Sequence, residues 1–207
     1  MSRYQFFCYY NNNNQLQLKS LEKFEQKGEI PPINQRLPSE PFIWKSNVMV
    51  DGPGVYGDVM RRVYGAGTEG WNFAVGQIQG WGGTEAYRES LVNISMMWMM
   101  KEPEPIPNLA RSWEWTDDGH TLIMKLVKGA HWSDGHEFTA EDVIFSYDHI
   151  LDDKIPSWQT KSTFSFGDQV TELKQIDKYT ISWHFGLAYP VVVLYQMDGL
   201  KQEQNFG

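Results

Sequence analysis

Histidine and carboxylate side chains crowd together at His131, Asp134, His136 and Glu137. Imidazole and carboxylate are common ligands of divalent metals, and a metal held there could activate water for hydrolysis. The spacing, however, matches neither an HExxH helix motif nor paired CxxC motifs. The intervening Ser-Asp-Gly sequence is typical of a turn. We therefore expect these side chains to be solvent-exposed polar groups of a turn, with no metal bound. A metal-assisted hydrolase using this region remains the alternative.

Two pairs of adjacent aspartates are a second possible source of acid-base chemistry. Asp117 precedes Asp118, and Asp152 precedes Asp153. Sequence neighbours seldom face one another, and each pair falls at a predicted turn or helix end, whereas paired catalytic carboxylates must face a shared substrate. We expect no catalytic residues and no enzyme activity.

Residues 65–70 spell GAGTEG, the GxGxxG fingerprint of dinucleotide-binding folds, directly after a strand predicted over residues 55–64. The fingerprint needs a helix immediately afterwards, so that the helix N-terminus meets the pyrophosphate. The following residues instead contain Gly76, Gly80, Gly82 and Gly83, which disfavour a helix. We expect no cofactor and predict an irregular loop in close contact with ligand or backbone.

The elements that position these residues are clearest in residues 107–151. Trp113 and Trp115 alternate on a short strand, and Asp118 with Gly119 supplies a turn in which glycine tolerates a positive φ. The pattern predicts a β-hairpin with one apolar face. On the return strand, that face carries Leu122, Met124 and Leu126.

A helix follows this hairpin. Thr139 and Asp142 have the spacing of a capping box, so the helix is expected to begin near Ala140, where Glu141 favours its positive end. Apolar residues then recur every three or four positions and predict one face packed on a sheet. These residues are Val143, Ile144, Tyr147, Ile150 and Leu151.

The phrases LARSW, DDG and KGAHWSDGHEFTAEDVIFSYDHIL within residues 107–151 closely resemble the family 5 extracellular solute-binding proteins of ABC importers, which include dipeptide and oligopeptide binders. Residues 21–38 and 55–65 resemble the N-terminal helix, proline turn and first strand of a subgroup. Residues 170–197 resemble the family's next strand pair and helix. Asp58 departs from the pattern, because the family usually has a second glycine there.

The resemblance implies a mixed α/β (α+β) fold, namely an incomplete first lobe of the two-lobed periplasmic-binding-protein-like fold of type II, cluster C. Residues 1–35 would form an N-terminal extension with a short helix, with a proline-spaced segment running extended from Pro31 to Pro41. Residues 36–207 would form part of lobe I, and the second lobe would be absent. We therefore expect a truncated chain with weak or no ligand binding by itself.

The same resemblance implies a function, with a non-binding structural fragment as an alternative. It predicts a monomeric substrate-binding component of an ABC importer that captures an oligopeptide or oligosaccharide and presents it to a membrane permease, in the periplasm or cell envelope. In such proteins the end of the first strand and the loop after it face the cleft, where aromatic rings can stack on a ligand. The ligand-binding residues predicted in this way are Tyr64, Gly65, Ala66, Gly67, Trp71 and Asn72.

Charge and composition bear on the kind of partner and on targeting signals. A net charge of -8 and a pI near 5.1 disfavour nucleic acid as a partner. Residues 1–14 contain only a short aromatic patch where a signal peptide needs about 7–15 apolar residues, so we expect no signal peptide there. Lipid modification of Cys8 is disfavoured because residues 5–7 lack the small side chains of a cleavage site. The alternative is an unpaired thiol in a disordered tail.

Overall fold

The computed structural model describes residues 10–11, 14–15, 19–40, 89–94, 105–152, 154, 164–188, 190 and 194. The strand predicted over residues 55–64 and the glycine-rich loop after it lie outside these residues. Within the described residues, no helix is long and apolar enough to cross a membrane.

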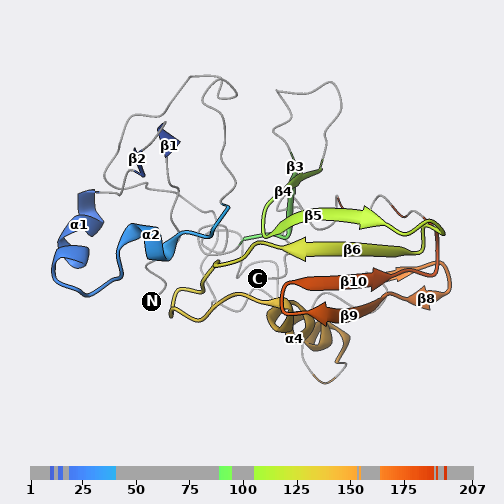
Figure 1. The fold of residues 1–207 in the computed structure, drawn as a ribbon. Coiled ribbons are helices and arrows are strands. Elements are labelled where there is room, and N and C mark those ends of the chain that lie inside the picture. Colours follow the sequence, from blue (N-terminus) through green and yellow to red (C-terminus); the bar gives the residue numbers. More distant parts are fainter. Residues whose placement is uncertain are drawn as a thin grey trace, which may run out of the picture.

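A four-stranded antiparallel sheet dominates the described part of the chain (Figure 1). Its strands are β5 (Ala110–Trp115), β6 (Thr121–Leu126), β9 (Glu172–Asp177) and β10 (Thr180–His184). The spatial order is β5-β6-β10-β9, so the last strand in sequence lies inside the sheet, between two earlier ones. Each strand pairs only with antiparallel neighbours.

The predicted hairpin of β5 and β6 is confirmed. Trp113 pairs with Met124 and Trp115 with Leu122, which places all four side chains on one face of the sheet. Gly119 turns the chain with a φ of 72°. The Thr116 hydroxyl donates to Asp118 at 2.6 Å and helps to fix this turn.

The core lies between one face of the sheet and the helix α4 (Ala140–Leu151). Leu122, Met124, Ile181 and Trp183 are fully buried there, as period-2 alternation on β6 and β10 requires. On α4, Val143 and Tyr147 are buried, and the helix lies against β9. The predicted packing face of this helix is therefore confirmed at these two positions.

Helix α4 begins as the sequence predicts. Thr139 has an extended backbone and is the N-cap, and the reciprocal capping box with Asp142 is formed. The Asp142 carboxylate accepts from the Thr139 amide at 2.7 Å. Such a box satisfies amides that a helix N-terminus leaves without partners.

Three two-stranded sheets accompany the main sheet. They pair β1 (Tyr10–Asn11) with β2 (Asn14–Gln15), β3 (Val92–Ile94) with β4 (Pro105–Pro107), and β7 (Ser165–Phe166) with β8 (Gln169–Val170). The Leu91 carbonyl accepts from the Ala110 amide at 2.8 Å, which joins the segment before β3 to the start of β5. Sheets and a helix together confirm a mixed α/β architecture.

The N-terminal segment contains the expected short helix, α1 (Lys19–Gln26), and Gly28 just after it has a φ of 71°. The extended path predicted for the proline-spaced segment is wrong in part, because α2 (Ile33–Arg36) forms one helical turn there. Pro32 is its N-cap, a position where the missing proline amide costs no helical hydrogen bond. Ser39 then donates its amide to Lys128 at 2.9 Å.

Leu122→Ala is expected to lower the free energy of unfolding by about 2–5 kcal/mol, because it leaves a cavity in the core face of the sheet. The matched control is Lys125→Ala on the exposed face of the same strand, where a change within about 0.5 kcal/mol is expected. Urea unfolding followed by circular dichroism measures both. Equal losses for the two variants would contradict this packing.

Candidate functional site

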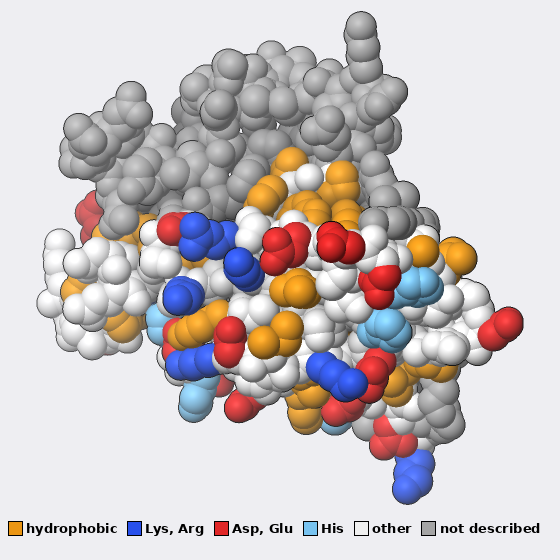
Figure 2. All heavy atoms as spheres, turned by 45° about the vertical axis from the view of Figure 1, so that its right-hand side comes forward, with side chains coloured by type: hydrophobic (Ala, Val, Ile, Leu, Met, Phe, Trp, Pro, Cys, Tyr) orange, Lys and Arg blue, Asp and Glu red, His pale blue; other side chains and the backbone are white. Residues whose placement is uncertain are grey.

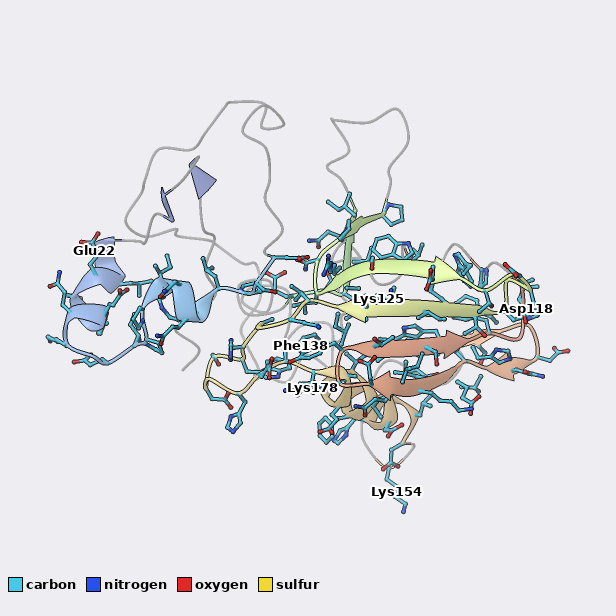
Figure 3. All side chains as sticks on the ribbon, viewed as in Figure 1. Glu22, Asp118, Lys125, Phe138, Lys154 and Lys178 are labelled. Carbon is cyan, nitrogen blue, oxygen red and sulfur yellow. The ribbon has the colours of Figure 1, made fainter. Side chains whose placement is uncertain are left out.

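The six residues predicted to bind ligand all lie outside the described residues. Their role stays a prediction based on the sequence. The structure does describe the histidine and carboxylate side chains of residues 131–137. This segment lies beside the start of α4 (Figure 3).

Residues 131–137 form a closed turn, as predicted. His131 and Glu137 make an antiparallel bridge, and the Trp132 amide donates to the His136 carbonyl at 2.8 Å. Gly135 has a φ of 93°, a conformation that residues with a Cβ rarely adopt, and its amide donates to Trp132 at 2.9 Å. Backbone geometry thus accounts for the Ser-Asp-Gly sequence.

The side chains of this turn make contacts both within the turn and with the β9–β10 hairpin. His136 Nδ1 lies 3.1 Å from Asp134 Oδ1, and both groups are largely exposed. Hydrogen bonds from the amide and ring of His136 hold the pKa of Asp134 below its usual value. Among the described residues, no group of three or more His, Cys, Asp or Glu side chains is placed to hold a metal ion.

Glu137 connects the turn to the β9–β10 hairpin. Its carboxylate accepts from Lys178 Nζ at 2.7 Å and from the Tyr179 hydroxyl. The hydrogen bond from Lys178, followed by that from Tyr179, lowers the pKa of Glu137, and the same pairing raises the pKa of Lys178. Figure 3 shows Lys178 beside the start of α4. The Glu137 carboxylate therefore holds the turn against the β9–β10 hairpin.

An open hollow of about 590 Å³ lies over this junction. Trp132 forms one apolar wall, and its Nε1 donates to Asp142 Oδ1 at 3.1 Å. This contact was not predicted from the sequence, since ten positions separate Trp132 and Asp142. The hollow is lined by Trp132, Asp134, His136, Glu137, Thr139, Glu141, Asp142 and Lys178.

The aspartate pairs belong to turns and a helix end, as predicted. Asp118 accepts from the His120 amide at 3.0 Å. Asp152 is the C-cap of α4 and accepts from the Lys154 amide at 2.9 Å. Asp153 lies outside the described residues.

The model of the bacterial extracellular solute-binding proteins, family 5 (Middle), matches residues 104–203, which contain the hairpin, the turn, α4 and the β9–β10 pair. The periplasmic alpha-galactoside-binding protein of Rhizobium meliloti (strain 1021) is 45% identical over 180 residues, or 85% of this chain and 26% of the relative. Residues 104–203 of this chain therefore match the family 5 extracellular solute-binding proteins. The chain spans about a quarter of the length of that relative.

Two solved structures of binding proteins are similar across most of this chain. The periplasmic binding protein MelB of Agrobacterium fabrum C58, in complex with stachyose, is 46% identical with a TM-score of 0.76, covering 86% of this chain and 27% of its own. An oligopeptide-binding protein, OppA, is 30% identical with a TM-score of 0.61, covering 86% and 25%. The dipeptide-binding protein of Escherichia coli (strain K12) is 31% identical over 93 residues, which is 39% of this chain and 17% of that protein. All these relatives are binding proteins by name.

Asp142→Ala is expected to lower the free energy of unfolding by about 1–3 kcal/mol, because it leaves Trp132 Nε1 and the Thr139 amide without their acceptor. Glu141→Ala on the same helical turn is the control, and its loss of a favourable helix-end charge should cost less than about 1 kcal/mol. Urea unfolding separates the two. A cost for Asp142→Ala no larger than the control would show that the capping junction contributes little.

Glu137→Gln should make the melting temperature depend less on pH in the acid range. The pKa of Glu137 is lower in the folded state than its ordinary value of 4.5, so its contribution is full above that pH and disappears as the pH falls through the folded value. Melting temperatures of wild type and variant should therefore differ above pH 4.5 and converge below it. A constant difference across pH 3–7 would contradict the role of the carboxylate's charge.

Proposed function

We propose that this chain is part of the substrate-binding component of an ABC importer that captures an oligosaccharide. The observation that carries the proposal is the 45% identity to an alpha-galactoside-binding protein over 85% of the chain. Binding without bond breaking is the expected chemistry. An importer's binding component works in the periplasm or cell envelope, as a monomer that delivers its cargo to a membrane permease.

A sugar is favoured over a peptide by two comparisons. Identity is 45–46% to the proteins named for an alpha-galactoside or bound to stachyose, against 30–31% to the peptide binders. The TM-score is 0.76 against stachyose-bound MelB and 0.61 against OppA. We therefore infer that the cargo is an oligosaccharide containing an α-galactoside.

We infer that the loop after residue 63 contributes to the sugar site. Trp71 offers an aromatic face that can pack on the C–H surface of a sugar ring, and Asn72 offers an amide for its hydroxyl groups. The glycines of the loop permit close approach of the backbone to the ligand. The ligand residues proposed are Tyr64, Gly65, Ala66, Gly67, Trp71 and Asn72.

A hybrid protein tests this proposal. In the Rhizobium alpha-galactoside-binding protein, the matching stretch is replaced by the 180 aligned residues of this chain. Isothermal titration with stachyose should show binding by the hybrid, and Trp71→Ala in the hybrid should weaken it by at least about tenfold through loss of stacking, as 1.4 kcal/mol is a tenfold change.

Two controls make the hybrid informative. Trp113→Ala in the hybrid alters the sheet rather than the loop, and should reduce thermal stability more than it reduces affinity. The isolated 207-residue chain should show no micromolar binding of stachyose, because most of the relatives' length is outside it. A folded hybrid that binds a dipeptide but not stachyose would overturn the sugar assignment, and unchanged affinity after Trp71→Ala would overturn the site.

A further inference from the structure

Two histidines meet at the end of the main sheet, far from the turn at residues 131–137 in sequence. His120 ends the β5–β6 turn, and His184 is the last residue of β10. Their ring centroids are 6.1 Å apart, with the rings inclined by 34°. His184 is exposed and His120 is half-buried, so both are open to solvent. Figure 2, which brings this end of the sheet forward, shows two histidine side chains beside each other at the surface.

Each imidazole is fixed through the same ring nitrogen. His120 Nδ1 is 2.9 Å from the Phe185 carbonyl, and a carbonyl can only accept, so this nitrogen carries the proton. His184 Nδ1 is 2.9 Å from the Thr121 hydroxyl, which accepts when His184 is in the tautomer that protonates Nδ1. His120, and His184 in that tautomer, each have a lone pair on Nε2. Metal-binding histidines are oriented by such contacts to the second nitrogen.

The ring spacing suits one shared ion. With metal–nitrogen bonds of about 2.0–2.1 Å, two imidazoles on one ion have ring centres between about 5 Å at a tetrahedral angle and about 6.4 Å on a straight line. The observed 6.1 Å falls within this range. A carboxylate adds negative charge nearby, because Asp118 interacts electrostatically with both histidines.

We propose that His120 and His184 form a surface site for a divalent transition-metal ion that favours imidazole, such as Zn²⁺, Ni²⁺ or Cu²⁺. The two histidine nitrogens would bind the ion, and water molecules would complete its coordination. The occupied site would join the β5–β6 turn to the end of β10, the two segments that the His120 and Thr121 hydrogen bonds already connect. It is separate from the proposed sugar site in sequence and in chemistry.

Titration of the untagged chain with Ni²⁺ tests the proposal, with ¹⁵N NMR as the readout. Resonances of residues 116–121 and 184–186 should broaden first, at one ion per chain. His184→Ala, at an exposed position, should weaken binding at least about tenfold, and Thr121→Val should weaken it about 10- to 100-fold by releasing the orientation of His184. The chain has five histidines, and His136→Ala and His149→Ala are the matched controls, expected to bind as wild type does.

The outcomes are distinct. Broadening centred on residues 131–137 or 149, or loss of binding in either control, would overturn the site, as would wild-type binding only above millimolar Ni²⁺. Far-UV circular dichroism and the melting temperature show whether His184→Ala and Thr121→Val remain folded. His184→Gln, which keeps a polar side chain for Thr121, should lose Ni²⁺ binding like His184→Ala. Retained binding in a folded His184→Gln variant would also overturn the proposal.

Discussion

The packing of Tyr147 against Trp183 is the contact on which the described fold depends. The two rings meet edge to face with centroids 5.3 Å apart, and the Phe164 ring also packs edge to face on Tyr147, at 5.2 Å. The Tyr147 hydroxyl donates to the buried Thr171 carbonyl, while burial raises the pKa of the phenol. One side chain thereby joins α4, the segment before β9 and the central strand β10. Without it, the apolar face of the sheet would lose a large part of the cover that α4 provides.

The contacts at the start of α4 explain the shape of residues 131–137. The turn must deliver the chain to the N-cap of α4 at a fixed angle, and Asp142 meets both Thr139 and Trp132 to do so. Glu137 holds the same turn to the β9–β10 hairpin through Lys178. Glu137, one of the residues that suggested a metal centre, is therefore used for positioning. The sugar site that we propose involves residues 64–72, which lie outside the described residues.

Much of the scaffold could be predicted from sequence because its signals are local. A glycine at positive φ, a capping box at three-residue spacing and period-2 burial on β6 each depend on a few neighbouring residues. The helical turn α2 was missed because its proline spacing favours extended chain, and the Trp132 contact was missed because it forms only when the turn folds back on α4. The loop for which we propose ligand binding, after residue 63, has no such periodicity in its sequence. Glycine permits many backbone conformations, so local sequence does not predict which side chains of such a loop face a ligand.

The position of β10 inside the sheet has a consequence for how the chain is made. A growing chain produces β5 and β6 first, and β6 then has an open edge rich in apolar residues until β10 is complete about 60 residues later. Open edges of this kind pair readily with other chains. Helix α4 is synthesised during this interval and can shield the apolar face, but only β10 can close the edge. Aggregation during synthesis should therefore depend on how soon the β9–β10 hairpin inserts, more than on the stability of the finished sheet.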